Sequence, residues 1–278
     1  MNTISVTDAP KNFRAALCQM HDVRPATTAA HHEAVERVIR VMHDRLNEPL
    51  TLQEMSRIAY ISPYHFNRIF RNITGIPPTQ FLYALRLETA KRLLLTTNTS
   101  VTNVCFDVGY NSLGTFIRRF TGLVGLSPNR FRSLAKHASE SLPLPASSPK
   151  SASSSAGISG RVTAPEWFAG TIFVGLFTTP IPQGDPISGT VMEQPGVYHV
   201  ASVPDGVYYI LAAGLARSND LREYFLYETT LRGGGQPILI RNGIVEGSTD
   251  LSLRPPGAFD PPILMTLPLL LARSTRGM

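Results

Sequence analysis

The sequence predicts a multidomain protein of 278 residues, in which an all-α domain is followed by an all-β sandwich. Two observations predict this fold class. A set of residues recurs at a constant offset of 50 positions, and the apolar pattern changes from helical spacing to alternation after a serine-rich segment. The repeated residues are Ser62, Phe66, Phe70, Gly75, Pro78 and Phe81, matched by Ser112, Phe116, Phe120, Gly125, Pro128 and Phe131.

Each repeat predicts a short amphipathic helix with a defined end. Phe66 and Phe70 are four residues apart, so both rings lie on one face of a helix. Gly75 is placed to end that helix in a left-handed cap, with Pro78 shortly after it. The second copy repeats the pattern, which indicates a duplicated structural unit.

A second helix upstream of each copy completes a helix-turn-helix, two short helices joined by a tight turn. The first unit spans about 51–75 and begins with Thr51 as N-cap and Glu54 as its capping-box partner. The second unit spans about 101–125. Between them, residues 77–96 predict one long amphipathic linker helix, with its basic residues on the polar face.

Charge is distributed unevenly between the two parts of the chain. The formal net charge is +6. Residues 31–137 contain 14 Lys and Arg against 7 Asp and Glu, whereas residues 159–278 contain 8 against 10. A basic helical region with two helix-turn-helix units favours binding to a polyanion, and double-stranded DNA is the expected partner.

Residues 31–137 resemble the DNA-binding domain of the AraC/XylS family of bacterial transcription regulators. The motifs that carry the resemblance are "LTLQEMSRIAYISPYHFNRIFRNITGIPPTQFL" and "DVGYNSLGTFIRRFTGLVGLSPNRFRSL". The resemblance implies an AraC-type, homeodomain-like fold of seven helices. It also implies two recognition helices in successive major grooves, roughly 34 Å apart along the duplex, and RNA polymerase as a partner.

Helix geometry indicates which residues of the first unit would face the bases. With the phenylalanines inward, the opposite face carries Tyr64, Asn67 and Arg68. Arg pairs with guanine, Asn with adenine, and Tyr stacks or reaches a phosphate. The resemblance points to the same three residues. His65 and Arg71 are expected either to contact phosphates or to take no part.

The second unit offers fewer hydrogen-bonding groups on the corresponding face. Its base-facing candidates are Thr115, Ile117 and Arg118, and Ile117 can only touch a thymine methyl. These positions are more polar in many relatives. We therefore expect the first recognition helix to read the sequence and the second to position the protein on phosphates, with Arg118 and Arg119 as anchors.

The remaining segments differ in composition and in the spacing of their apolar residues. Residues 1–30 lack periodicity and an apolar signal-peptide region, so they predict a flexible N-terminal segment. Residues 138–158 are rich in Ser, Pro and Ala and predict a flexible linker. Residues 159–272 show period-two alternation broken by Gly and Pro, typical of a β-sandwich.

Three strands and a hairpin are predicted within the β-domain. Asn242-Gly243 favours a type I′ turn between apolar flanks. The segment "SVPDGVYYILA" weakly resembles carboxypeptidase-regulatory or transthyretin-like domains, which supports the fold alone. The strands are predicted at 170–177, 196–203 and 206–215.

No catalytic residues, cofactor or metal site are predicted. Cys18 and Cys105 are the only cysteines, which indicates a reducing cytoplasm, and Cys105 is expected to be buried. No run is long enough to span a membrane. The predicted function is sequence-specific transcription regulation, with residues 159–272 binding a small-molecule effector or a protein partner, or forming a homodimer. The alternative is a ligand-binding protein or enzyme that carries a DNA-targeting module.

Overall fold

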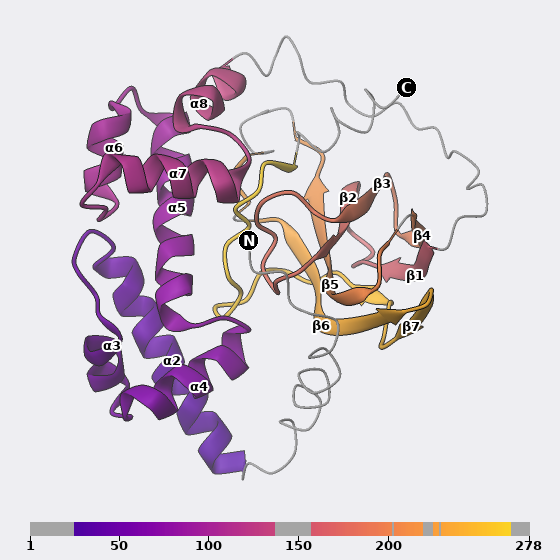
Figure 1. Cartoon of the computed structure of the whole chain (residues 1–278), viewed down its shortest axis with the longest axis horizontal. Coiled ribbons are helices and arrows are strands. Elements are labelled where there is room, and N and C mark those ends of the chain that lie inside the picture. The colour runs from indigo at the N-terminus through magenta and orange to yellow at the C-terminus, as the bar shows by residue number, and fades with distance from the viewer. Residues whose placement is uncertain (1–24, 137–156, 202, 219–224, 228, 268–278) are drawn as a thin grey trace.

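The structure is a computed structural model that describes residues 25–136, 157–201, 203–218, 225–227 and 229–267. A helical part and a β-sheet part lie side by side, with the helices on the left and the sheets on the right of Figure 1. The predicted fold class, a double helix-turn-helix followed by an all-β region, is confirmed.

Seven helices form the helical part between residues 25 and 136. Helix α3 and helix α4 make the first helix-turn-helix, helix α6 and helix α7 make the second, and helix α5 connects them. The first helix begins at Pro25, inside the segment expected to be flexible, while residues 1–24 lie outside the described part. The helices are α2 (Pro25–Asp44), α3 (Leu52–Ala59), α4 (Pro63–Thr74), α5 (Pro78–Thr96), α6 (Val101–Asp107), α7 (Leu113–Val124) and α8 (Pro128–Lys136).

Local sequence signals explain where these helices begin and end. The Thr51 backbone N–H donates to Glu54 Oε2 at 2.7 Å, and the Glu54 N–H donates to Thr51 Oγ1 at 3.2 Å, which is the predicted capping box. Gly75 and Gly125 adopt φ angles of 82° and 87°, so both recognition helices end in the left-handed conformation. Cys105 is buried, as predicted.

Two glycines of the second unit provide a matched pair of stability predictions. Gly122 lies inside α7, and a Cβ there would meet nothing within 4 Å, so Gly122→Ala should raise the free energy of unfolding by about 0.5–1 kcal/mol. Gly125→Ala should lower it by about 1 kcal/mol, because alanine is strained at φ 87°. Denaturant unfolding of both variants measures the difference, and effects of equal sign would contradict this account.

Helix α5 differs from its prediction in one respect. It is buried on most sides rather than amphipathic, because both helix-turn-helix units and the β-sheet part pack around it. Arg86 is buried and donates to the carbonyls of Leu46 at 2.9 Å and Glu48 at 2.7 Å. Its guanidinium also lies against Gly109 in the turn of the second unit, so this side chain ties both units together.

The described residues of the β-sheet part form eight strands in two sheets. One sheet has the order β4-β1-β8, with β1 and β8 parallel, and the other has the antiparallel order β3-β2-β5-β6-β7. The first strand begins two residues before the predicted domain boundary, and residues 137–156 of the predicted linker lie outside the described part. The strands are β1 (Gly157–Thr163), β2 (Gly170–Phe177), β3 (Ser188–Met192), β4 (Gly196–Ala201), β5 (Gly206–Ala216), β6 (Leu231–Arg241), β7 (Ile244–Glu246) and β8 (Leu251–Ser252).

The two sheets face each other across one apolar core, so they form a sandwich. Ile158 and Val200 from the smaller sheet pack in the same cluster as Ile172 and Ile238 from the larger one. The hairpin between β6 and β7 turns at Asn242 and Gly243, whose φ angles of 50° and 76° are both positive, as a type I′ turn requires.

The outer face of the larger sheet is also covered. Phe173 and Leu215 on that face pack against Tyr227 and against the C-terminal stretch of residues 259–267, hereafter the C-terminal segment. Strand β2 is therefore buried on both faces, which explains its continuous apolar run. The C-terminal segment lies between the sheet and the helices (Figure 1).

The helical and β-sheet parts share their apolar cores. Ile181, from the β2–β3 loop (residues 178–187), is fully buried among residues of the first helix-turn-helix and α2. Phe225 and Leu264 are buried in the cluster of the second helix-turn-helix, where the rings of Phe225 and Phe131 lie 5.8 Å apart. The sequence predicted a flexible linker and no such contact.

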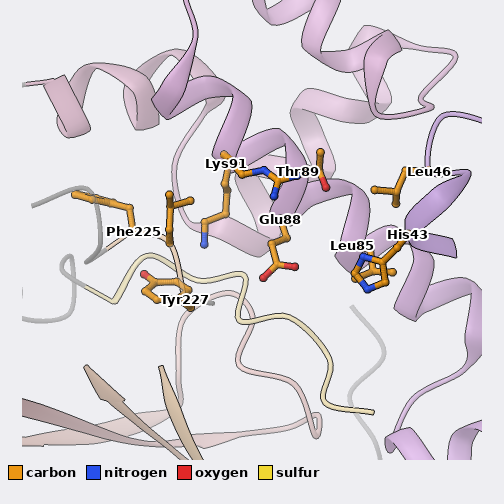
Figure 2. A pocket seen from close by; sticks show the side chains of 10 residues that line it. His43, Leu46, Leu85, Glu88, Thr89, Lys91, Phe225 and Tyr227 are labelled. Atoms are coloured by element: carbon orange, nitrogen blue, oxygen red, sulfur yellow. The ribbon is translucent and has the colours of Figure 1, made fainter. Parts of the chain in front are cut away.

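Lys91 of α5 is buried at this interface, where it extends toward Tyr227 (Figure 2), and its burial makes stability depend on pH. Burial lowers the pKa of its ammonium from 10.5 to about 7, with Glu88 opposing and Arg232 assisting the shift. Below pH 7 the folded state therefore carries the full cost of a buried charge. This cost falls as the pH rises from 7 to 10.5, because only the unfolded state then binds the proton.

Replacing Lys91 with Met should consequently stabilise the protein. We expect a gain of about 2–4 kcal/mol below pH 7 that shrinks as the pH approaches 10.5. Denaturant unfolding between pH 6 and pH 10 measures it, with the exposed Arg241→Met as the control that should change little. A gain that does not vary with pH would show that the charge is not the cause.

Candidate nucleic-acid interface

The first recognition helix, α4, separates an apolar face from a polar one. Phe66, Ile69 and Phe70 are buried, and the rings of the two phenylalanines lie 5.6 Å apart in an edge-to-face arrangement. Tyr60 begins the approach to α4 with a φ of 58°, and Pro63 occupies the first turn of the helix. The turn and the buried face together fix which side of α4 is exposed.

The candidate base-reading residues of α4 lie together on that exposed side. Tyr64 is 83% exposed, Arg68 and Arg71 are exposed, and Asn67 is half-buried. His65 is half-buried instead, and its ring lies 5.8 Å from that of His31 on α2. This face therefore presents two guanidinium groups, a phenol and an amide within two turns of helix.

The second recognition helix, α7, presents a less polar surface. Arg118 is exposed and Ile117 is 37% exposed, whereas Thr115 is half-buried. The N–H of Thr115 already donates to Ser112 Oγ at 3.4 Å, because Ser112 caps the helix. Arg118 is thus the charged side chain on the exposed face of α7.

Arg119 faces a neighbouring helix rather than the same surface as Arg118. Its guanidinium carbon lies 4.0 Å from the centre of the Tyr83 ring on α5, a cation–π contact. Arg119 therefore helps to hold α7 against α5, and its expected role as a phosphate anchor stays a prediction.

The β-sheet part contacts the C-terminal ends of both recognition helices. The Leu123 carbonyl at the end of α7 accepts a hydrogen bond from the Gly184 N–H at 2.7 Å. The Val124 carbonyl accepts from the N–H of Thr266 at 3.1 Å and from its hydroxyl at 3.0 Å. The last carbonyls of a helix lack partners within the helix, so these bonds supply them.

The end of α4 is contacted by the same β2–β3 loop. Pro180 packs against the Gly75 cap, where an added Cβ would lie 3.6 Å from the proline side chain. Ile181 follows it into the first apolar core, and Gly184 reaches the end of α7. One loop therefore joins the ends of both recognition helices, while α5 connects them on the helical side.

Sequence reasoning missed this bridge because nothing local marks it. Pro180, Ile181 and Gly184 read as an ordinary turn between strands, and their partners lie 60 or more positions earlier in the chain. Tyr60, in the turn before α4, is 85% exposed, and the guanidinium carbon of Arg37 lies 5.3 Å from the centre of its ring.

Comparison with known proteins agrees with this arrangement. A family model described as a helix-turn-helix domain matches residues 55–133, and AraC-type regulators recur among the similar proteins. These residues form an AraC-type domain.

Relatives of the AraC-type domain are found in several bacteria. The bifunctional transcriptional activator/DNA repair enzyme AdaA of Bacillus subtilis is 32% identical over 104 residues, 37% of this chain and 49% of that protein. The MmsAB operon regulatory protein of Pseudomonas aeruginosa is 31% identical over 124 residues, 45% of this chain and 40% of its own length. The chain thus spans less than half of either relative.

Solved structures match the same region. The DNA-binding domain of AdpA, solved in complex with a target DNA, is 31% identical and covers 38% of this chain and 95% of that one, with a TM-score of 0.36. The C-terminal domain of AraT, a response regulator from Geobacillus stearothermophilus, is 28% identical and covers 36% and 84%, with a TM-score of 0.35.

Other kinds of site are not found in the described residues. They contain no group of three or more His, Cys, Asp or Glu side chains placed to hold a metal ion. No helix among them is both long enough and apolar enough to cross a lipid bilayer. In the β-sheet part, the Nδ1 atom of His199 lies 3.0 Å from the hydroxyl oxygen of Ser159, within hydrogen-bonding distance.

Proposed function

We propose that this protein is a transcription regulator that binds DNA through the AraC-type domain, with α4 and α7 in successive major grooves. The observation that carries the proposal is the pair of recognition helices held on one scaffold, with Arg68 and Arg71 exposed on α4 and Arg118 exposed on α7. Relatives of this domain are named as a transcriptional activator and an operon regulatory protein, which supports the same function.

The two helices have different roles in this proposal. Helix α4 reads bases with Tyr64, Asn67 and Arg68, which lie on one exposed face. Helix α7 contacts mainly the backbone through Arg118, because Ile117 beside it offers no hydrogen bond. Phosphate contacts fix the register on the duplex, and base contacts provide the specificity.

The β-sheet part, in this proposal, sets the geometry of the reading helices. Its β2–β3 loop joins the C-terminal ends of α4 and α7, and these ends lie away from the N-terminal residues that face the bases. A fixed spacing between the helices favours one spacing of half-sites on DNA. Effector binding, a homodimer, contact with RNA polymerase and a cytoplasmic location stay predictions.

Selection of bound sites from random duplexes tests the proposal. We expect enrichment of two short sequence elements about one helical turn apart, with the more strongly specified element contacted by α4. The selection should be made at moderate salt, where phosphate contacts alone discriminate poorly. A pool without an enriched motif, bound with an affinity that depends on salt alone, would reduce the protein to a nonspecific DNA binder.

A further inference from the structure

Tyr60, in the turn between α3 and α4, has a backbone conformation that side chains with a Cβ disfavour. Its φ of 58° and ψ of 35° are left-handed, and its N–H donates to the Arg57 carbonyl at 3.1 Å to end α3. At the ends of α4, α6 and α7 the left-handed residue is a glycine, with Gly75, Gly109 and Gly125 in these places. Position 60 therefore carries a tyrosine where the fold favours glycine.

Among the described residues, one other non-glycine residue has a positive φ, and its turn explains it. Asn242, with a φ of 50°, lies in the type I′ turn between β6 and β7, which requires this conformation and in which Asn is common. The end of α3 makes no such demand on the side chain of Tyr60, since glycine adopts the same conformation without strain. Backbone strain that the local fold does not require is concentrated at functional sites.

The ring of Tyr60 is outside the apolar core. It is 85% exposed, whereas Tyr110, which occupies the same position of the 50-residue repeat, is buried with its ring 5.3 Å from that of Phe116. Burial therefore explains the tyrosine of the second unit and not that of the first.

The contact between Tyr60 and α2 does not explain its retention either. The guanidinium carbon of Arg37 lies 5.3 Å from the centre of the Tyr60 ring, and cation–π contacts at exposed sites are weak. Arg37 also donates from Nε to the Ile58 carbonyl at 3.2 Å and lies 4.0 Å from the Glu33 carboxylate. The bond to Ile58 joins α2 to the end of α3 without help from the ring.

Tyr60 lies next to the candidate base-reading residues. Two residues separate it from Pro63, which begins α4, and Tyr64 in the first turn of α4 is 83% exposed. The N-terminal residues of a recognition helix enter the major groove, so the turn before them comes near the phosphates at the edge of that groove. Figure 1 shows α3 on the side of the helical part that faces away from the sheets, which leaves this turn accessible.

We propose that the Tyr60 hydroxyl donates a hydrogen bond to a phosphate of the DNA backbone, beside the groove that α4 occupies. This inference rests on the proposed function and adds a contact from outside the recognition helices. Tyrosine hydroxyls are among the groups that position proteins on phosphates, and the ring has few rotatable bonds to immobilise. The charge of Arg37 is shared with Glu33, so the hydroxyl rather than this guanidinium supplies the contact.

Affinity and stability measured on the same variants of the full chain test the contact. Tyr60→Phe keeps the ring and the backbone conformation, and we expect it to weaken binding about 3–10-fold, both to the selected duplex and to an unrelated duplex of equal length. Its slope of log affinity against log salt should not change, because no charge is removed. Trp167→Phe, at a 67% exposed aromatic residue of the β-sheet part, should bind as the unmodified chain does.

Tyr60→Gly separates a binding role from a structural one. Glycine relieves the left-handed strain, so the denaturant midpoint should rise or stay unchanged, while DNA affinity falls at least as much as in Tyr60→Phe. A residue kept for the stability of the turn would instead lower the midpoint when it is replaced.

Replacing single phosphates of the selected duplex with uncharged methylphosphonates locates the partner. At one position, the methylphosphonate should weaken the unmodified chain, and Tyr60→Phe should then cause little further loss, because both changes remove the same hydrogen bond. At the other positions the two losses should add.

Three results would each overturn the Tyr60 contact. They are unchanged affinity of Tyr60→Phe for both duplexes, a lowered midpoint for Tyr60→Gly, or additive losses at every phosphate. If Arg68→Ala still loses base discrimination, the Tyr60 contact fails alone and the proposed function stands. If the unmodified chain binds neither duplex, both fail together.

Discussion

Replacing Arg68 with Ala is expected to reduce discrimination between the selected DNA site and its single-base mismatches. The loss should be about 1–3 kcal/mol at the base pair that this guanidinium contacts, or roughly 5–150-fold in relative affinity. Arg68 is exposed on α4 beside Tyr64 and Asn67, where its bidentate pairing with guanine would provide the specificity. Competition binding against a complete set of single mismatches measures the effect. Asn67→Ala should give a similar loss at a neighbouring adenine.

Arg118→Ala on α7 is the matched comparison. It removes an exposed guanidinium from the equivalent position of the second unit, so the overall charge change is the same. We expect affinity to fall about equally for all sequences, with the slope of log affinity against log salt reduced by about 1. Equal loss of discrimination from Arg68→Ala and Arg118→Ala would falsify the division of roles between the two helices.

Placing a carboxylate at position 181 is expected to detach the β2–β3 loop from the helices. Ile181 is fully buried in the apolar core of the first helix-turn-helix, so Ile181→Asp places a carboxylate among apolar side chains. The free energy of unfolding should fall by about 3 kcal/mol or more. Chemical denaturation of the full chain measures this change.

The same variant should also relax the spacing requirement on DNA. One inserted base pair rotates a half-site by about 35° around the duplex. The unmodified protein should discriminate strongly against this insertion, and Ile181→Asp should discriminate less. Ile187→Asp, at the far end of the same loop, is the control, because Ile187 is 48% exposed and should tolerate the charge. If both variants keep the original spacing preference, α5 alone sets the distance between the helices.

The sequence predicted the helical part closely because its signals are local. The Phe66 and Phe70 pair, its copy in the second unit, the Thr51 capping box and the two terminal glycines all act within a few residues. Such patterns determine where a helix begins, ends and faces. The exposed faces of α4 and α7 followed from the same patterns, and the base-facing assignments made on them stay predictions.

The basic residues of the helical part show where this reasoning stops. Helical periodicity predicts Arg86 and Lys91 on the polar face of a surface helix, but both are buried. Lys91 contacts a carbonyl 172 positions away, and the Thr266 hydroxyl reaches the end of α7 across 142 positions. Periodicity describes which residues share a face, whereas the partner of that face depends on packing between distant segments.

The capping of α7 by Gly184 and Thr266 affects how the chain can be divided. A helix-turn-helix domain is usually treated as an independently folding domain that occurs together with many different partner domains. Here the last turn of one recognition helix takes its hydrogen-bond donors from the sandwich, and the sandwich covers apolar rings of the same unit. Cutting the chain within residues 137–156 would leave those carbonyls and rings exposed. The helical and β-sheet parts should therefore unfold in a single thermal transition, and the second helix-turn-helix unit should not be fully stable without the sandwich.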